Sequence, residues 1–580
     1  MAQGTSSLTT MEQLRSLSGI YWISNWMELI ERFAYYGVRT VLPVFMVLSL
    51  AEGGPEFTHV EKGSIYAIWA LVQSFVPIFS GVFADRYGYK LNIAISTILK
   101  ILGYLGMGYC IVMAEALAGM PIAEARAAGV DQTYWIFFVG AQLLALGTAI
   151  FKPGVQGLIS NQLNEKTSAL GWSIFYQAVN IGGFVGPFIA GYLRILDWEY
   201  VFLLCSVAIA LNFIPLFFFK EPAPGDAKAS PWELIVRATK GLLEPRLFYF
   251  TMAFAGFWLM FYQLFDILPN FIDDWVDSRA VATMLQGVFG EAAIPTVNGG
   301  NLTQEWIINF NPLLISFFAF IFGYLTGKVR ALTAIIIGIA ISCVGIYALG
   351  MSMDGWWIFI AIAGFSIGEM TASPTKMRYM ASIAPPGRDG QYMGYVNMTV
   401  GIGWSIGSII AGELYETGGD KINLAKRYLV ENAGVAADTV EGLARNEVLP
   451  LLEKTASVDA WGARELLWST YEPYSLWAIF TWIGFGSMLL LIIYNRVVLA
   501  AEADPNHTFN TRGRLYVQAV IVPVLAIFLW ASFAKGSGAI YVWTALFAIM
   551  LFASFVTEEE PIEAAAASPD EGSGEDDLDA

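Results

Sequence analysis

Four charged side chains stand close together in a stretch that is otherwise apolar and aromatic. Glu28, Glu31, Arg32 and Arg39 lie in a segment from residue 20 to about residue 50 that is long and apolar enough to cross a bilayer as a helix. Each charge at mid-membrane costs roughly 2.5–3.5 kcal/mol, so four unpaired charges would cost about 10–14 kcal/mol. They must therefore pair with one another or face water. Such a set is typical of a proton or substrate site, and a structural ion pair that pins helix packing is the alternative.

Other polar residues interrupt later apolar stretches. Lys152 lies midway along one of them, too deep for its ammonium group to reach the surface. Asp266 and Glu369 are carboxylates in comparable positions, and Asn180 and Asn311 are amides. We expect a functional role for Lys152 and Glu369. For the two asparagines, hydrogen bonding between helices is at least as good an explanation as contact with a substrate.

The composition indicates a polytopic helical membrane protein. Of the 580 residues, 56% are hydrophobic and 14% are charged. The formal charge of −17 comes largely from the final residues, and no segment is basic enough to predict nucleic-acid binding. The three cysteines and two histidines show no metal-ligand spacing. No nucleophile elbow or P-loop is present, so we expect neither an enzyme nor a cofactor.

The elements that must position these residues are long apolar segments in two groups of six. We expect an all-α membrane protein with bundles at 1–220 and 246–500, joined by a linker at 221–245 that contains an amphipathic helix. Two repeated bundles predict a site between them at mid-membrane. The expected spans are 18–48, 61–84, 91–114, 133–162, 166–194, 197–219, 246–273, 306–327, 331–352, 356–381, 389–416 and 473–499.

Several segments lie outside this core. A long loop at 276–304 follows the seventh span, and an ordered insertion outside the membrane is expected at 417–470. Residues 501–556 contain two more apolar stretches, which predict an added transmembrane hairpin and about fourteen spans in total. The acidic tail at 557–580 is expected to be disordered. Lysines and arginines in the short loops place both termini in the cytoplasm of a multi-pass protein of the plasma (inner) membrane.

The motifs on these segments resemble one transporter family. The run Glu-x-x-Glu-Arg-Phe-x-Tyr-Tyr-Gly at 28–37 is similar to the first-helix motif of the proton-coupled oligopeptide transporters, which belong to the major facilitator superfamily. The resemblance covers roughly residues 18–500. It is supported by the runs at 81–90, 152–153, 175–182, 311–312 and 369–374.

The resemblance implies the major facilitator fold and proton-driven import of di- and tripeptides by alternating access, with a monomeric functional unit. It assigns proton coupling to Glu28, Glu31 and Arg32. It assigns the substrate site to Tyr35, Tyr36, Arg39, Lys152, Asn180, Asn311 and Glu369. Arg32, Arg39 and Lys152 would meet the peptide carboxylate, and Glu369 would meet the amino end with the two asparagines.

Three positions depart from the family pattern. Ser74 and Val396 stand where the family has Tyr and Trp, and Tyr262 replaces the seventh-helix acid. Asp266, one turn further along, is then a candidate replacement partner for Lys152. Two other classes of function stay open. One is a transporter of the same fold for nitrate, an amino acid or a peptide-like compound, and the other is a non-transporting membrane receptor or scaffold.

Overall fold

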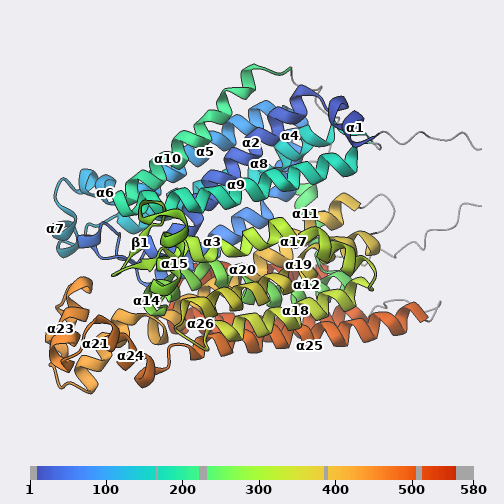
Figure 1. Ribbon diagram of the computed structural model, residues 1–580. Coiled ribbons are helices and arrows are strands. Elements are labelled where there is room, and N and C mark those ends of the chain that lie inside the picture. The colour runs from blue at the N-terminus through green and yellow to red at the C-terminus, as the bar shows by residue number, and fades with distance from the viewer. Residues whose placement is uncertain (1–8, 165–166, 221–230, 385–388, 504–511, 557–580) are drawn as a thin grey trace, which may run out of the picture.

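The protein is built from long helices arranged in two layers (Figure 1). The computed structural model describes residues 9–164, 167–220, 231–384, 389–503 and 512–556. Figure 1 shows the first half of the chain, in blue to green, above the second half, in yellow to red. The expected all-α class is therefore confirmed. The acidic tail at 557–580 lies outside the described residues.

The first layer contains the helices that correspond to the first six expected spans. The second span is broken at Val76, because the ring of Pro77 cannot continue the hydrogen-bond ladder of the preceding helix. The layer consists of α2 (Gly19–Phe45), α3 (His59–Phe75) with α4 (Pro77–Tyr87), α5 (Tyr89–Gly108), α8 (Thr133–Ser160), α9 (Ser168–Leu196) and α10 (Trp198–Ala210). Short helices flank it: α1 (Thr10–Ser16), α6 (Cys110–Ala118) and α7 (Ile122–Ala127).

The second layer repeats this arrangement after the linker helix α11 (Pro231–Leu242). It consists of α12 (Pro245–Phe261) with α13 (Gln263–Asp266) and α14 (Leu268–Trp275), then α17 (Phe310–Gly327), α18 (Ala331–Leu349), α19 (Gly355–Ile383), α20 (Asp389–Gly418) and α25 (Ser475–Ala503). The expected loop at 276–304 is more structured than a loop. It holds α15 (Arg279–Phe289) and an antiparallel pair of strands, β1 (Thr296–Val297) and β2 (Asn301–Leu302), and leads into α16 (Gln304–Ile308).

The residues of the 417–470 insertion form four α-helices with a small apolar centre. They are α21 (Lys421–Glu431), α22 (Ala437–Glu441), α23 (Val448–Ala456) and α24 (Ala460–Tyr471). Leu429, Leu452 and Leu467 are fully buried among them. In Figure 1 these helices lie at the same end of the molecule as α6, α7 and β1, and α1 lies at the opposite end. We call the two ends the insertion end and the α1 end.

Twelve helices in the described part of the chain are long and apolar enough to cross a membrane. They include both arms of the C-terminal hairpin, α26 (Arg512–Lys535) and α27 (Gly538–Val556). Neither α2 nor α20 is among the twelve, although both were expected as spans. Charged residues interrupt α2 at 28, 31, 32 and 39. The total of about fourteen therefore stays a prediction.

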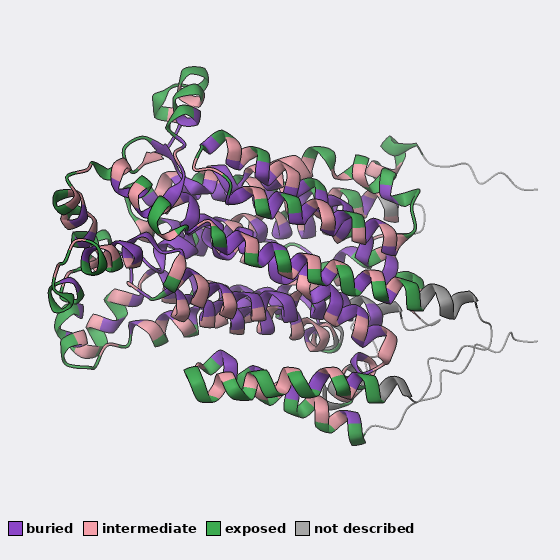
Figure 2. Cartoon of the chain, turned by 90° about the horizontal axis from the view of Figure 1, so that it is seen from below, coloured by how far each residue is buried: buried purple, intermediate pink, exposed green. Residues whose placement is uncertain are grey.

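The hairpin packs across the seam between the two layers. Trp543 of α27 donates from Nε1 to Oγ of Ser405 on α20 at 2.8 Å. Ser537, between the hairpin arms, lies 3.0 Å (Oγ–Oγ) from Ser64 on α3. Only 11% of the α26 span is buried in the protein, which agrees with a peripheral position that leaves most of its surface to lipid. Buried residues concentrate instead where helices face one another (Figure 2).

Glycines let α2 approach α9 closely. A Cβ atom on Gly186 would overlap the carbonyl oxygen of Phe33, and one on Gly182 would overlap that of Leu29. Small residues at helix contacts of this kind are how membrane helices gain packing without a hydrophobic driving force. The contact fixes the rotation of α2, and with it the direction in which its charged residues point.

We therefore expect Gly186→Ala to lower the thermal unfolding midpoint of the detergent-solubilised protein by about 5 °C, because overpacking costs roughly 1–3 kcal/mol. Gly486→Ala is the matched control, since a Cβ there meets nothing within 4 Å. Equal midpoints for the two variants would contradict the close packing of α2 on α9.

Candidate functional site

The charged residues of α2 form a closed network with one more residue than the sequence predicted. Arg32 contacts Glu28 (Nε–Oε1, 3.2 Å) and also pairs with Glu31. Lys100 of α5 pairs with the other oxygen of Glu31 (Nζ–Oε1, 2.7 Å). All four side chains are at most 3% exposed. Two carboxylates and two cations therefore balance one another, and we call these four residues the α2 charge cluster.

Lys100 was missed, although a signal was available. It lies in the middle of the third expected span, so the rule that singled out Lys152 applies to it equally. Its ammonium group also lies 3.9 Å from the centre of the Phe151 ring. Gly147 makes room for it, because a Cβ there would lie 2.7 Å from Cγ of Lys100.

Asp266 pairs with Arg39 and not, as expected, with Lys152. Arg39 also donates from Nη1 to the carbonyl oxygen of Phe265 at 3.1 Å. The other carboxylate oxygen of Asp266 accepts from Trp404 Nε1 at 3.1 Å and from Ser408 Oγ at 2.6 Å. Both carboxylate oxygens of Asp266 thus have partners, and Lys152 is not one of them.

Tyr262 accompanies this change of partner. Its ring stacks on that of Trp404, with 4.3 Å between ring centres and 6° between planes. The Tyr262 ring therefore occupies the position of the family's seventh-helix acid. Asp266, one turn later, pairs with Arg39 of α2. The other two departures are packing positions. Ser74 is buried 2.6 Å from where a Cβ of Gly401 would lie, and Val396 is 2% exposed within the core of the second layer.

Glu369 and Asn311 are brought together as the sequence suggested. Nδ2 of Asn311 lies 2.9 Å from Oε2 of Glu369 and 2.9 Å from Oγ of Ser366. The amide thus holds the half-buried carboxylate in one orientation. Asn180 donates instead to the carbonyl oxygen of Tyr176 in its own helix, at 2.9 Å.

Lys152 lies opposite, on α8 of the first layer. It is half-buried and makes no ion pair with any described carboxylate, yet it lies within electrostatic range of Glu28 and Glu31. Tyr36 is half-buried and interacts electrostatically with Glu369 across the two layers. A cation of the first layer and an anion of the second layer thus lie near the boundary between the layers, because each is within electrostatic range of Lys376 on α19.

The two expected tyrosines differ in position. Tyr35 is 5% exposed, and its hydroxyl donates to Oε1 of Gln73 at 3.0 Å. Trp69 donates to the same oxygen at 2.7 Å. The guanidinium group of Arg32 lies 5.1 Å from the Tyr35 ring centre and 5.9 Å from that of Tyr36. Of the two, the half-buried Tyr36 is therefore better placed to meet a ligand, whereas the buried Tyr35 ring packs beside the Arg32 guanidinium group.

Polar contacts close the layers together toward the insertion end. Arg194 of α9 lies 3.3 Å (Nη1–Oε1) from Glu305 of α16. Lys62 of α3 donates to Oδ1 of Asn270 on α14 at 2.7 Å. Asn270 in turn donates to the carbonyl oxygen of Pro43 on α2 at 2.7 Å. Together with the Arg39–Asp266 pair, these contacts form what we call the outer gate.

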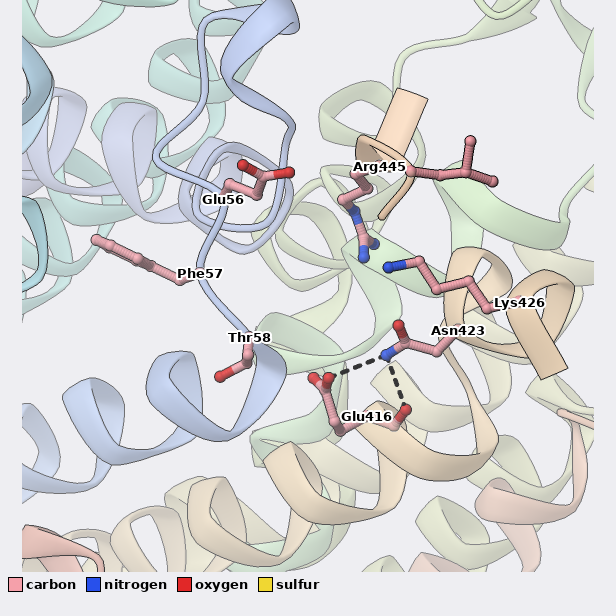
Figure 3. Close-up of a pocket in the computed structure, with 8 residues that line it drawn as sticks. Glu56, Phe57, Thr58, Glu416, Asn423, Lys426 and Arg445 are labelled. Atoms are coloured by element: carbon pink, nitrogen blue, oxygen red, sulfur yellow. Dashed lines mark hydrogen bonds between the residues drawn. The ribbon is translucent and has the colours of Figure 1, made fainter. Parts of the chain in front are cut away.

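A second set of contacts ties α3 to the insertion. His59 Nε2 lies 2.9 Å from Oδ2 of Asp420, which also pairs with Arg445. The backbone N–H of His59 donates to Oε2 of Glu416 at 2.6 Å. We call His59, Glu416, Asp420 and Arg445 the outer latch. Beside it lies a pocket of about 230 Å³ in which the Glu416 and Asn423 side chains are hydrogen-bonded (Figure 3).

The Asp420 carboxylate of the outer latch has a lowered pKa. Burial raises the pKa of Asp420, but Arg445 and His59 outweigh burial and hold this pKa below its usual range. A lowered pKa means that the stabilisation is present above the ordinary value of about 3.9 and is lost only in stronger acid. Asp420 therefore stays ionised between about pH 5 and pH 8.

Exposed side chains follow the site residues toward the α1 end. Gln156 follows Lys152 by one helical turn on the same face, and Gln177 precedes Asn180 in the same way. Both polar side chains are exposed, as is Met377, two turns beyond Glu369. Each lies on the α1 side of its partner.

A family model of the Major Facilitator Superfamily matches residues 26–290 and 278–424. The chain belongs to the Major Facilitator Superfamily. Among its relatives, the uncharacterised transporter YclF of Bacillus subtilis (strain 168) is 24% identical over 458 residues, covering 69% of this chain and 87% of that protein. The peptide transporter YePEPT of Yersinia enterocolitica is 23% identical over 470 residues (69% and 87%). The multidrug resistance protein MdtH of Proteus mirabilis is 22% identical over 384 residues (66% and 84%).

Solved structures share the superfamily fold. A POT family transporter in complex with a thioalcohol-conjugated peptide aligns with a TM-score of 0.57 at 16% identity, over 84% of this chain and 99% of that one. The peptide transporter POT in complex with sulfate aligns with a TM-score of 0.56 at 16% identity, over 85% and 99%. The expected fold is thereby confirmed. The protein is an integral, multi-pass secondary transporter of this superfamily.

We expect Asp266→Ala to lower the free energy of unfolding by about 3–5 kcal/mol, because it leaves Arg39 buried without a counter-charge. Glu431→Ala, which removes an exposed i,i+4 pair with Arg427, should cost less than about 1 kcal/mol. The double variant Arg39→Met/Asp266→Leu should recover part of the loss, since apolar residues often replace buried pairs at little cost. Thermal or denaturant unfolding in detergent measures all three. A loss in Asp266→Ala no greater than in the control would contradict the pairing.

We further expect Asp420→Ala to open the insertion end. In a variant whose three buried native cysteines are replaced, Thr40→Cys lies between Arg39 and Pro43, two residues of the outer gate, and is 4% exposed as Thr. Losing 1.4 kcal/mol of latch energy would raise its labelling by an impermeant maleimide about tenfold. Glu431→Ala, in the same insertion, should leave the labelling rate unchanged. Unchanged labelling in Asp420→Ala would show that the latch does not hold the gate.

Proposed function

We propose that this protein is a proton-coupled symporter that imports di- and tripeptides by alternating access. The observation that carries the proposal is the placement of Lys152 and Glu369 on opposite layers, each within electrostatic range of Lys376. A peptide zwitterion leaving water needs a cation for its carboxylate and an anion for its amino group. The similarity to proteins named as peptide transporters supports the same cargo.

The α2 charge cluster suits a proton-coupling role. Glu31 holds Arg32 on one oxygen and Lys100 on the other. A proton on Glu31 would remove the charge that holds Lys100 and one of the two that hold Arg32. Arg32 would then be held by Glu28 alone and could turn more readily toward the peptide carboxylate beside Lys152. Arg39, also assigned to the carboxylate by resemblance, is engaged by Asp266 in this conformation. Its proposed task here is therefore to close the outer gate.

The helix α2 connects the protonation of Glu31 with the closing of the outer gate by Arg39. Glu31 and Arg39 are eight residues apart on α2, about 12 Å along its axis. A shift of α2 that follows protonation of the cluster would move Arg39 relative to Asp266. With both termini in the cytoplasm, as proposed, the contacts at the insertion end make this conformation the inward-facing one. Opening outward would then require the outer gate and the outer latch to break.

A second candidate cargo is a small solute other than a peptide. It is favoured by the similarity to MdtH, which is named as a multidrug resistance protein, and by Tyr262 in place of the expected acid. Competition against labelled dialanine uptake distinguishes the two cargoes. Strong competition by peptides and none by nitrate, single amino acids or drug-like cations supports the peptide symporter.

The decisive experiment uses purified protein in liposomes. Wild type should accumulate labelled dialanine when the outside is made acidic. Glu31→Gln should lose this pH-driven uptake while keeping the exchange of peptide between two equal pools, because exchange requires no net proton movement. Lys100 would be left with a weakened partner in that variant.

The double variant Glu31→Gln/Lys100→Met therefore serves as the control for folding. It removes one negative and one positive charge together, so the cluster stays balanced and exchange should persist at close to the wild-type rate. Loss of exchange in both variants, at an unchanged thermal midpoint, would contradict a proton-coupling role. Gradient-driven uptake in Glu31→Gln equal to wild type would contradict it as well.

A further inference from the structure

Lys376 is a buried cation that the proposed mechanism does not use. It lies on α19, seven residues after Glu369 and so on the same face of the helix. Its side chain is 6% exposed. The ammonium nitrogen lies 3.8 Å from the centre of the Trp258 ring, and among the described residues no carboxylate comes within ion-pair distance. Lysines are rarely buried without a counter-charge.

The charges around it do not balance. The α2 charge cluster is neutral in itself, and Arg39 is neutralised by Asp266. Lys152, Lys376 and Glu369 make no ion pair among the described residues, and Lys376 interacts electrostatically with both of the others. Two cations and one anion are thus grouped here without direct partners of opposite charge. A peptide with uncharged side chains would use one of each and leave one ammonium group without a partner.

Trp258 adds a donor beside this cation. Its indole N–H is buried and has no hydrogen-bond partner in the part of the chain that the structure describes. The ring face attracts the ammonium group through its quadrupole but leaves the positive charge in place. The Lys376 ammonium group has no counter-charge and the Trp258 indole N–H has no acceptor, and the two lie next to each other. A carboxylate could pair with the first and accept a hydrogen bond from the second.

We propose that Lys376 is a specificity-determining residue that binds the side-chain carboxylate of acidic di- and tripeptides. The inference rests on the proposed function and names the preferred cargo of that same site. Glu369 takes the amino end, Lys152 takes the terminal carboxylate, and Lys376 takes a second carboxylate. Seven residues of helix place Lys376 about 10 Å along α19 from Glu369. An extended dipeptide of about 7 Å with an acidic side chain, together with the length of the lysine itself, spans that distance.

The test is competition against labelled dialanine uptake in proteoliposomes. Alanyl-glutamate and alanyl-glutamine have nearly the same shape and differ in charge. We expect alanyl-glutamate to compete at least tenfold better with wild type. Lys376→Met should remove this difference while dialanine uptake stays within twofold of wild type. Lys376→Arg should retain most of the preference because it keeps the positive charge.

Controls separate this inference from the proposed function. Lys328→Met removes an exposed lysine at the end of α17 and should leave the preference intact. Dialanine transport without any preference for alanyl-glutamate in wild type would overturn the role of Lys376 and leave the peptide symporter standing. Failure to transport any peptide would overturn the proposed function itself.

Loss of dialanine uptake in Lys376→Met, at an unchanged thermal midpoint, would show that Lys376 holds the terminal carboxylate, and would also overturn the inference. If Lys376→Met lowers the thermal unfolding midpoint, the same competition assay is made with Lys376→Gln, which keeps a polar end to the side chain. The same equalisation of the two dipeptides in a stable Lys376→Gln supports the inference, and a retained difference contradicts it.

Discussion

A charge inside a membrane protein must have a partner or water, and this requirement organises the whole molecule. The energetic penalty for burying an uncompensated charge is several kcal/mol, comparable with the net stability of many proteins. On α2 it is met by the cluster of Glu28, Glu31, Arg32 and Lys100, which is neutral as a unit. Arg32 and Lys100 both pair with Glu31, so a proton on Glu31 would change the electrostatic environment of two cations at once.

The distribution of polar and apolar contacts fits a protein whose halves move. The two largest apolar clusters each draw almost all of their members from one layer. The gate and latch contacts between layers toward the insertion end are mostly ion pairs and hydrogen bonds, such as Arg194–Glu305 and Lys62–Asn270. Water can replace a polar partner when such a contact opens, whereas an exposed apolar core cannot be satisfied in this way. Each layer can thus move as a body while its core stays packed.

Two features set this chain apart from the pattern of the family it resembles. The seventh-helix acid has moved by one turn, and the vacated position is filled by Tyr262 stacked on Trp404. Trp404 also donates to Asp266, so the ring pair positions the relocated carboxylate against Arg39. The helices of the insertion, in turn, contact the first layer through His59. Both features lie in the closing apparatus at the insertion end, whereas Glu28, Glu31 and Arg32 keep the family's first-helix pattern.

Most of the fold and many of the buried charges of the candidate site could be predicted from the sequence, because those signals are local. A long apolar run indicates a membrane-spanning helix wherever it occurs, and a charge within such a run stands out without knowledge of its partner. Glu28, Arg32, Lys152 and Glu369 were found in this way. The same reasoning applied to Lys100 would have found it too.

Which charge meets which partner was decided only by the tertiary structure. Arg39 and Asp266 are 227 residues apart, and His59 and Asp420 are 361 apart. Pairing across such separations depends on the depth and rotation of each helix. For α2 these are set by the close approach of its backbone to glycines such as Gly186 on α9. Asp266 lies one turn, about 5.4 Å, beyond the position of Tyr262, and at that depth it pairs with Arg39. The local sequence determines on which face of a helix a residue lies. Only the packing of the helices determines which residues that face contacts.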